Sequence, residues 1–264
     1  MTEIELTTGF GRSAVHRRGD VLVRDSGPWT PAVHALLNHL EEVGFSAAPR
    51  LVGTGYDAEG RETLTYVEGG SAHPGGWSLE GAAAVGRLIR DLHDAVGAFK
   101  PPKDAVWFPW HAREVGDGRR IISHCDTAPW NIVAVDGLPV ALIDWEFAGP
   151  ADPLVELAQA CWLNAKLHDD IVAELEGLPP LADRARQLRA MVDAYGLPRA
   201  DRARMFELMV EFVVSEVAWE ADDAGVTPDM TTHQAGLWAM AWRARSARWL
   251  LRNRRTLVNA LTAR

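Results

Sequence analysis

The sequence contains little of what defines several large classes of protein. Its 264 residues include only two cysteines, Cys125 and Cys161, so no disulfide framework can form and a reducing compartment suits the chain. No apolar run reaches the roughly 18 residues that a membrane-spanning helix needs. Acidic residues outnumber Lys and Arg by 36 to 27, which gives a formal net charge of −9. This balance argues against a nucleic-acid partner, which requires a basic surface.

Lysine is the scarcest charged residue. It occurs only at Lys100, Lys103 and Lys166, so the first 99 residues contain none. The N-terminal segment MTEIELTTGF is acidic and alternating, which is unlike a signal peptide. From these features we expect a cytoplasmic protein that has neither a nucleic acid nor a membrane as its partner. We expect it to be a monomer or a homodimer.

The chain is long enough for one large domain or for two lobes that share a cleft. Alternating segments broken by glycine predict the strands of an antiparallel sheet, and they cover 4–10, 13–25, 49–55 and 61–70. Between them, the segment 27–45 has helical spacing. The second of these segments is long enough for two strands, so the predicted order is three strands, one helix and two strands.

The Gly-rich segment GGSAHPGG at 69–76 is the best candidate for a boundary between lobes. We therefore predict an N-lobe over 1–68 and a C-lobe over 69–264. Within the second part we expect a hairpin turn at VDGLP and helices at roughly 78–97, 153–166, 181–195, 200–222 and 231–262.

The segment HCDTAPWN, residues 124–131, bends the chain sharply between two apolar runs. If the strands on either side of VDGLP pair, Asn131 at the start of one lies close to Asp144 at the end of the other, with Asp126 in the bend just before. Such oxygen ligands suit Mg²⁺, and Asp126 could instead receive a proton from an attacking hydroxyl. The alternative is that Asp126 and Asn131 only hydrogen-bond their own turn.

This segment matches H-x-D-x-x-x-x-N, the pattern of a kinase catalytic loop. The segment ALIDWEFAGPADPLVELA also resembles the metal-binding segment of the aminoglycoside phosphotransferase family, a group of small-molecule kinases. The resemblance implies an α+β, bilobal protein-kinase-like fold with a small antiparallel-sheet N-lobe and a mainly helical C-lobe. It implies Asp126 as the catalytic base, Asn131 and Asp144 as Mg²⁺ ligands, and His124 as a structural residue that holds the backbone near Asp144. Glu156 stands where the family usually has Asp.

Two further features favour small-molecule substrates over proteins. Only seven residues separate Asp144 from Asp152, which leaves no room for an activation loop. Cys125, rather than an arginine, precedes Asp126, so no arginine there awaits an activating phosphate. Both features favour a site that is always formed.

The nucleotide side departs from the family at several positions. TTGFGRSAVHR resembles a Gly-rich phosphate loop, which assigns ATP or GTP to Gly9, Gly11 and Ser13, although Ala14 stands where a third glycine is usual. By the same resemblance Thr65, Tyr66 and Val67 form the hinge that binds the adenine. The third strand carries Arg24 where the family has a phosphate-binding lysine, and the helix carries His34 where a glutamate is expected, with Glu41 and Glu42 a turn or two later. The alternative for Arg24 is a solvated strand residue.

On the acceptor side, Glu216, Glu220 and Asp223 share one side of a predicted helix. They could bind a cationic small-molecule acceptor such as an aminoglycoside. The alternative is that arginines of the last helix neutralise them within the fold, and these are Arg243, Arg245, Arg248, Arg252, Arg254 and Arg255. Trp238, Trp242 and Trp249 form a stripe at helical spacing that we expect to pack in the core.

We expect an ATP- and Mg²⁺-dependent phosphotransferase that acts on a hydroxyl of a small molecule, such as an aminoglycoside-type antibiotic. The missing Lys–Glu pair supports an alternative, a catalytically weak or inactive kinase-like module for binding or immunity. A third interpretation is an iron site built from His124, Asp126 and either His168 or His233. The run of helices after residue 153 argues against that interpretation.

Overall fold

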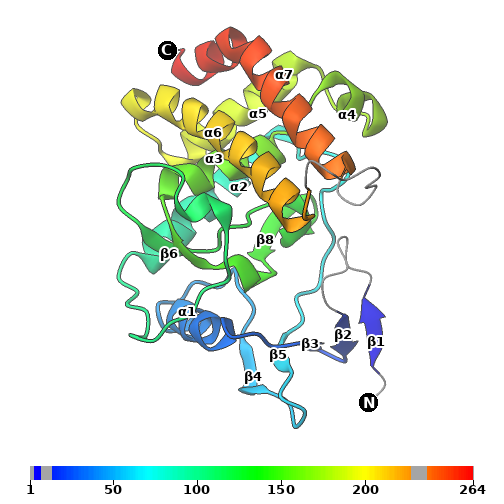
Figure 1. Ribbon diagram of the computed structural model, residues 1–264, viewed down its shortest axis with the longest axis vertical. Helices are drawn as coiled ribbons and strands as arrows, with labels where there is room; N and C mark the ends of the chain where they lie inside the picture. Colours follow the sequence, from blue (N-terminus) through cyan, green and yellow to red (C-terminus); the bar gives the residue numbers. More distant parts are fainter. Residues whose placement is uncertain (1–2, 7–13, 227–236, 264) are drawn as a thin grey trace.

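The computed structural model describes residues 3–6, 14–226 and 237–263. Figure 1 shows a sheet and one helix at one end of the molecule and most of the helices at the other. The first five strands form one antiparallel sheet in the order β1-β2-β3-β5-β4. They are β1 (Ile4–Leu6), β2 (Val15–Arg18), β3 (Val21–Arg24), β4 (Leu51–Tyr56) and β5 (Glu62–Thr65). The predicted α+β architecture is confirmed, whereas the boundary between residues 68 and 69 stays a prediction.

Helix α1 (Thr30–Glu42) lies between β3 and β4 in the chain. Its apolar side chains recur at helical spacing, and Val33, Leu36, Leu37 and Leu40 are all buried. The helix packs against β4 and against the long helix α2 (Leu79–Val96). Through α1 the sheet is therefore attached to the helical part of the molecule.

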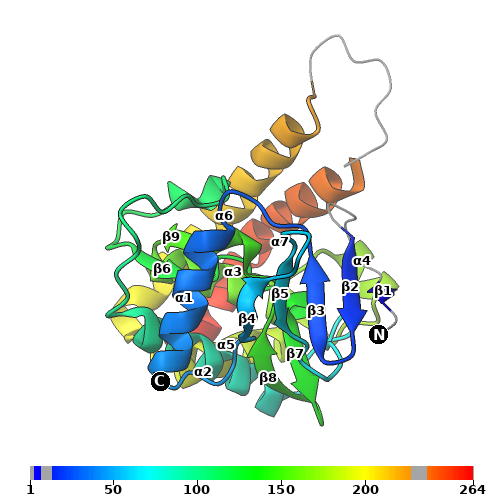
Figure 2. The same cartoon turned by 90° about the horizontal axis from the view of Figure 1, so that it is seen from below.

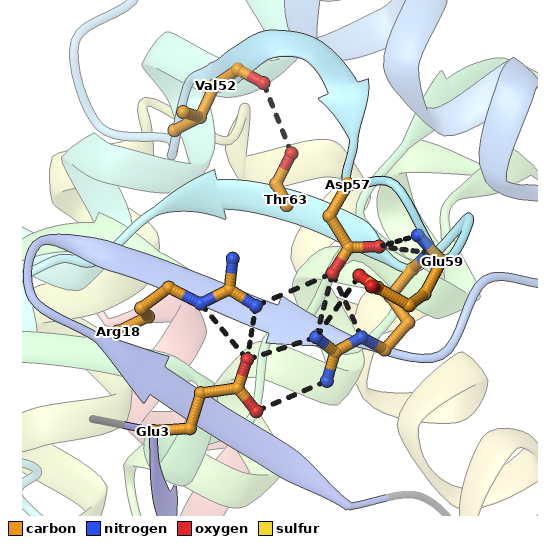
Figure 3. Close-up of polar contacts among 7 residues, drawn as sticks. Glu3, Arg18, Val52, Asp57, Glu59 and Thr63 are labelled. Carbon is orange, nitrogen blue, oxygen red and sulfur yellow. Dashed lines mark hydrogen bonds and ion pairs between the residues drawn. The ribbon is translucent and has the colours of Figure 1, made fainter. Parts of the chain in front are cut away.

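A cluster of charged side chains ties the first strand to the turn between β4 and β5 (Figure 3). Glu3 accepts hydrogen bonds from Arg18 Nε at 3.0 Å and from Arg61 Nη2 at 3.0 Å. Arg61 also bonds Asp57 in that turn, with Nη2 2.8 Å from Oδ2. Figure 3 also shows Thr63 on β5 donating to the Val52 carbonyl on β4, at 3.1 Å. These contacts hold the edges of the sheet together on the side away from the helices.

Beyond residue 69 the structure is mainly helical. α2 packs against α5, α6 packs against α7, and α3 packs against α6. Figure 2 shows α6 and α7 side by side, with one end of the pair projecting from the body. The remaining helices are α3 (Pro153–Asn164), α4 (Asp170–Leu175), α5 (Leu181–Tyr195), α6 (Arg199–Asp223) and α7 (Leu237–Thr262). None of the helices in the described ranges is both long and apolar enough to cross a membrane.

The predicted tryptophan stripe is only partly a core feature. Trp249 is 2% exposed, and Trp242 stacks on the buried Trp162 with ring centroids 5.3 Å apart. Trp238 is 53% exposed, so the prediction that it packs in the core is wrong. It lies in the first turn of α7, beyond the part of α6 that carries buried side chains, so the core formed by the described residues does not extend to it.

Two short sheets bracket the predicted catalytic segment. β6 (Ile121–Ser123) pairs with β9 (Gly149–Ala151), and β7 (Ile132–Val135) pairs with β8 (Leu138–Leu142), all antiparallel. Asp136 and Gly137 join β7 to β8 with positive φ angles of 50° and 76°, which is the backbone of a tight two-residue hairpin turn. Because Ile132 lies opposite Leu142, the residues just outside the hairpin meet at its open end.

Candidate active site

His124 ties the segment 124–131 to the catalytic hairpin. Its Nε2 lies 2.8 Å from the carbonyl oxygen of Ile143, and its Nδ1 accepts the N–H of Asp126 at 3.2 Å. Nε2 must therefore carry the proton and donate it to Ile143. The ring is fully buried, and burial lowers the pKa of His124, which keeps it neutral. His124 thus joins the bend to the backbone immediately before Asp144.

Glu156, on α3, also holds this bend. Its carboxylate is fully buried and accepts the N–H of Cys125 at 2.7 Å and lies 2.6 Å from His93 Nε2. His93 Nδ1 lies 2.8 Å from the hydroxyl of Tyr195. Burial raises the pKa of Glu156, but the bonds from His93 and Cys125 outweigh it and hold that pKa below its ordinary value. Sequence reasoning missed the roles of His93 and Tyr195, because these two residues come from distant helices.

Asp126 and Asn131 are in direct contact. Asn131 Nδ2 donates to Asp126 Oδ2 at 2.7 Å and to the Asp126 carbonyl at 3.1 Å. The backbone N–H of Ile143 donates to the Asn131 carbonyl at 2.9 Å, which places Asp144 at the same end of the hairpin. Asp144 itself has left-handed backbone angles, φ 62° and ψ 65°, so its side chain leaves the strand direction. Asp126 and Asn131 therefore do hydrogen-bond within their own turn, as the alternative interpretation of these residues expects. Asp144 also lies at this end of the hairpin.

The electrostatic surroundings of Asp126 favour its protonated form. Burial, the negative charge of Asp144 and that of Glu216 together raise the pKa of Asp126 to about 8. The bond from Asn131 and the charge of Arg243 act in the opposite direction. A carboxylate with a raised pKa is a stronger proton acceptor once it is ionised, which is the property a general base requires.

Arg24 reaches this group of carboxylates from the sheet. Its Nη1 donates to Asp144 Oδ1 at 2.6 Å, and its Nε donates to Glu62. The side chain is only 11% exposed, so the alternative of a solvated strand residue is wrong. The second oxygen of Glu62 lies 3.0 Å from His34 Nε2. The buried acidic partner of Arg24 is thus Glu62 on β5.

Helix α1 does not supply the acidic partner of Arg24. Glu41 and Glu42 are both exposed, and Glu41 lies 3.8 Å from Arg50 instead. The expectation that the helix presents a glutamate to the cation is corrected, because α1 contributes only His34. Sequence reasoning missed Glu62 because the contact depends on the strand register, in which Arg24 and Glu62 lie directly opposite each other.

The other residues predicted to bind the nucleotide lie either in the segment 65–67 or outside the described residues. Gly9, Gly11 and Ser13 lie outside the described residues. The N–H of Thr65 donates to the Arg50 carbonyl and that of Tyr66 to the Asp20 carbonyl, each at 2.8 Å. Adenine recognition through these two N–H groups would compete with those bonds. The roles of Thr65, Tyr66 and Val67 stay predictions.

A cavity of about 420 Å³ adjoins Arg24 and Glu62. Trp29 and Phe108, whose rings meet edge to face at 4.6 Å, form part of its wall, and Glu146 also lines it. Open space therefore reaches the cation of the candidate site from the side of the loop before α1.

On the acceptor side, the acidic residues have a partner within the fold. Arg243 Nη2 on α7 lies 2.9 Å from Glu216 Oε1 and 3.0 Å from Glu220 Oε1, and all three side chains are largely buried. Neutralisation by the last helix, one of the two interpretations of this acidic stretch, is thus observed for these two residues. Asp223 is exposed at the end of α6. The assignment of all three to an acceptor stays a prediction.

The donor set can be compared with the needs of Mg²⁺ and of iron. Asn131 donates a hydrogen bond from Nδ2 to Asp126, which leaves its amide oxygen for a metal. Asp144 adds a carboxylate that is 46% exposed. These hard oxygen donors fit Mg²⁺, which takes few protein ligands and completes its shell with phosphate oxygens and water. Among the described residues, no three or more His, Cys, Asp or Glu side chains are grouped to hold a metal. Both nitrogens of His124 are already bonded, so the iron interpretation with His168 is wrong, while His233 lies outside the described residues.

An antiparallel sheet with one helix, a helical second part and a catalytic-loop pattern between them define a protein-kinase-like fold. The sequence model of the phosphotransferase enzyme family matches residues 101–208. Over 254 residues the chain is 51% identical to the trifolitoxin immunity protein of Rhizobium leguminosarum bv. trifolii, covering 96% of this chain and 97% of that protein. The chain therefore belongs to the phosphotransferase enzyme family, and the resemblance drawn from its motifs is confirmed.

Solved structures of small-molecule kinases share the fold. A choline/ethanolamine kinase family protein from Mesorhizobium loti superposes with a TM-score of 0.62 at 17% identity, covering 99% of this chain and 92% of that one. A microcompartment-associated aminopropanol kinase gives 0.65 at 14% identity, covering 97% and 94%. An amicoumacin kinase, solved in complex with AMP-PNP, Ca²⁺ and Ami, gives 0.66 at 12% identity, covering 94% and 87%.

Proposed function

We propose that this protein is an ATP- or GTP-dependent, Mg²⁺-dependent phosphotransferase that phosphorylates a hydroxyl of a toxic small molecule. The observation that carries the proposal is the meeting of Asp126, Asn131 and Asp144 at the open end of one hairpin. A catalytic-loop carboxylate, a carboxamide and a second carboxylate are the parts with which kinases accept a proton and hold the metal of a nucleotide. Membership of the phosphotransferase family supports the same reaction.

In this proposal each residue has one task. Asn131 and Asp144 would hold Mg²⁺, which neutralises phosphate charge when it is bound. The acceptor hydroxyl approaches Asp126, gives its proton to the carboxylate and forms a bond to the terminal phosphorus, while the bond from that phosphorus to the nucleoside diphosphate breaks. Most of the catalytic advantage then comes from positioning and charge, because phosphoryl transfer needs little covalent help from the protein.

The proposed acceptor class rests on the relatives. The 51% identical relative is named for immunity to trifolitoxin, and an aminoglycoside phosphotransferase with the same fold was solved in a ternary complex with AMP-PNP and hygromycin B. Both support a role in protection against a toxic compound. The ion pairs of Arg243 lower the negative charge beside Asp126, so a strongly polycationic acceptor such as an aminoglycoside has less local support than the sequence suggested.

One observation favours the second candidate, a kinase-like module that confers immunity by binding without efficient phosphate transfer. Arg24 replaces the usual lysine, and its Nη1 bonds the carboxylate of Asp144 that would hold the metal. A cation in that position competes with Mg²⁺ for the same oxygen. If it were not displaced, nucleotide would bind weakly and turnover would be low.

A turnover assay separates the two candidates. The purified protein is mixed with ATP or GTP, MgCl₂ and single members of a panel of toxins, macrolides, aminoglycosides, amino alcohols and nucleosides. The proposal expects nucleotide consumption that depends on one acceptor, and a product heavier by one phosphate in mass spectrometry. The Asp126→Asn variant is the matched control and should not form that product. A compound that binds and raises the thermal midpoint without being phosphorylated would instead support the binding module.

A further inference from the structure

The acidic partner of Arg24 is fixed by the sheet. β3 and β5 are antiparallel neighbours, and their register sets Arg24 directly opposite Glu62. Side chains that are opposite each other on one face of a sheet have Cβ atoms about 5 Å apart, so the two are in contact without any adjustment of a helix. Glu62 is only 2% exposed, and burying it requires partners that compensate its charge.

Arg24 divides its guanidinium between two carboxylates from different parts of the chain. Nε donates to Glu62, and Nη1 donates to Asp144 at 2.6 Å. The two ends differ in accessibility, because the side chain of Glu62 is 2% exposed and that of Asp144 is 46% exposed. A planar guanidinium can hold both groups at once, whereas a lysine ammonium is a single point of charge. The Glu62 end is thus a buried anchor, and the Nη1 end faces the open site.

His34 completes the anchor from the helix. Its Nε2 lies 3.0 Å from Oε1 of Glu62, the oxygen that Arg24 Nε does not use. A glycine makes room for the ring, since a Cβ at Gly55 would lie 2.6 Å from His34 Cε1. Tyr56 packs beside it with ring centroids 4.8 Å apart. The helix therefore contributes a donor to Glu62 at the place where related kinases would supply an acid to the cation.

We propose that Glu62 is the positioning residue of the phosphate-binding cation, and that it holds Arg24 by Nε while Nη1 passes from Asp144 to a nucleotide phosphate. This inference rests on the proposed function. It explains how the cation can leave Asp144 without leaving the site, because only one of its two contacts has to change. It also removes the conflict between Arg24 and a metal at Asp144, since the released Nη1 has a phosphate oxygen to bond.

The test measures nucleotide affinity rather than turnover alone. AMP-PNP is titrated calorimetrically, with and without MgCl₂, into wild-type protein and into the Glu62→Gln, Arg24→Met and Glu59→Gln variants. Glu62→Gln and Arg24→Met should each weaken binding about 10-fold or more, the size expected for losing a hydrogen bond to a charged group. Glu59→Gln, at a 66% exposed position in the turn between β4 and β5, is the control and should stay within about 3-fold of wild type.

A double-mutant cycle distinguishes positioning from a general structural role. If Glu62 acts through Arg24, the Arg24→Met/Glu62→Gln protein should bind AMP-PNP no more weakly than Arg24→Met alone. The acceptor KM should change less than the nucleotide KM in Glu62→Gln. Thermal midpoints without nucleotide show which variants are folded. If Glu62→Gln is unfolded, Glu62→Asp replaces it, and its shorter reach should weaken AMP-PNP binding in the same direction.

Three results would overturn the inference alone: wild-type affinity in Glu62→Gln, an equal loss in Glu59→Gln, or additive losses in the double variant. Failure of the wild-type protein to bind AMP-PNP or any nucleoside triphosphate is a different result. It would overturn the proposed function, and the inference with it.

Discussion

Asn131 donates its Nδ2 hydrogen bond to Asp126 at 2.7 Å, so the amide that faces the candidate metal position also fixes one oxygen of the candidate base. The contact orients both side chains at once. It leaves the amide oxygen of Asn131 for a metal and the second oxygen of Asp126 for a substrate proton. The Asp126→Asn substitution keeps a side-chain oxygen that can accept the same bond, but it removes the negative charge. It therefore tests the charge of Asp126 while the contact with Asn131 is retained.

Asp126→Asn should therefore lower turnover while preserving the fold and the nucleotide affinity. General-base catalysis contributes roughly 100-fold or more, and the amide cannot accept the proton of the acceptor hydroxyl. We expect kcat to fall by about that factor, with AMP-PNP affinity within about 3-fold of wild type. Steady-state kinetics and calorimetry measure the two quantities. Wild-type kcat in this variant would show that Asp126 is not the base.

Asp144→Ala should abolish the effect of Mg²⁺ on nucleotide affinity. Asp144 supplies the more exposed of the two proposed metal ligands, and without it Mg²⁺ has only the Asn131 oxygen from the protein. We expect AMP-PNP titrations with and without MgCl₂ to give nearly the same Kd in the variant. The control is Asp136→Asn, in the exposed turn at the other end of the same hairpin. A Mg²⁺ effect of wild-type size in Asp144→Ala would place the metal elsewhere.

The catalytic hairpin could be predicted because its parts are close in the sequence. Residues 124–131 and 144–156 belong to a bend, a hairpin and the following helix, and local pairing alone brings Asn131 to Asp144. The family resemblance added the roles. The main helices were also predictable from their length and periodicity, whereas α4 has only six residues and too little sequence to show a period.

The partners of the site residues could not be predicted, since they depend on contacts between distant segments. Glu62 follows from the register of β3 against β5, which the sequence does not fix. Arg243 was one of six arginines on the last helix, and only the packing of α7 on α6 shows that this one faces Glu216 and Glu220. Trp238 shares the helical spacing of Trp242 and Trp249, but the described part of the core ends before this turn of α7, and Trp238 is exposed.

Glu156→Ala should strongly destabilise the protein and disorder the catalytic bend. The substitution leaves the buried His93 ring and the Cys125 N–H without their shared acceptor. Removing one partner of a buried, hydrogen-bonded pair costs about 3–5 kcal/mol. Urea unfolding should show a loss of that order, whereas Glu59→Ala, at a site that is 66% exposed, should change stability by less than about 0.5 kcal/mol. A small loss in Glu156→Ala would mean that the bend is held by His124 alone.

His111 should make the protein sensitive to acid. Burial, with a contribution from the charge of Arg243, lowers the pKa of His111 from 6.5 to about 4. The unfolded chain binds a proton at this residue below pH 6.5 and the folded protein does not. The free energy of unfolding therefore falls as the pH falls from about 6.5 to 4.

The test is His111→Phe, because neither ring nitrogen of His111 has a hydrogen-bond partner among the described residues and Phe keeps a ring in the same place. Thermal midpoints at pH 7 and pH 5 should differ less in the variant than in the wild type. The contacts of the ring with Phe212 and Trp219 should persist in the variant. An equal pH effect in both proteins would assign the acid sensitivity to other groups.

Arg243→Gln should shift acceptor preference toward cationic compounds. Arg243 pairs with Glu216 and Glu220, and its charge acts on Asp126, so its removal leaves an uncompensated negative charge beside the proposed base. A cationic acceptor could then replace the lost guanidinium. We expect its KM to fall relative to that of a neutral acceptor, and to rise more steeply with salt because exposed charges are screened within about 10 Å at 0.1 M ionic strength. Arg248→Gln, at an exposed position on the same helix, is the control and should change neither quantity. If both variants keep the wild-type ratio of KM values at every salt concentration, Arg243 serves only to neutralise Glu216 and Glu220 within the fold, and the acceptor binds elsewhere.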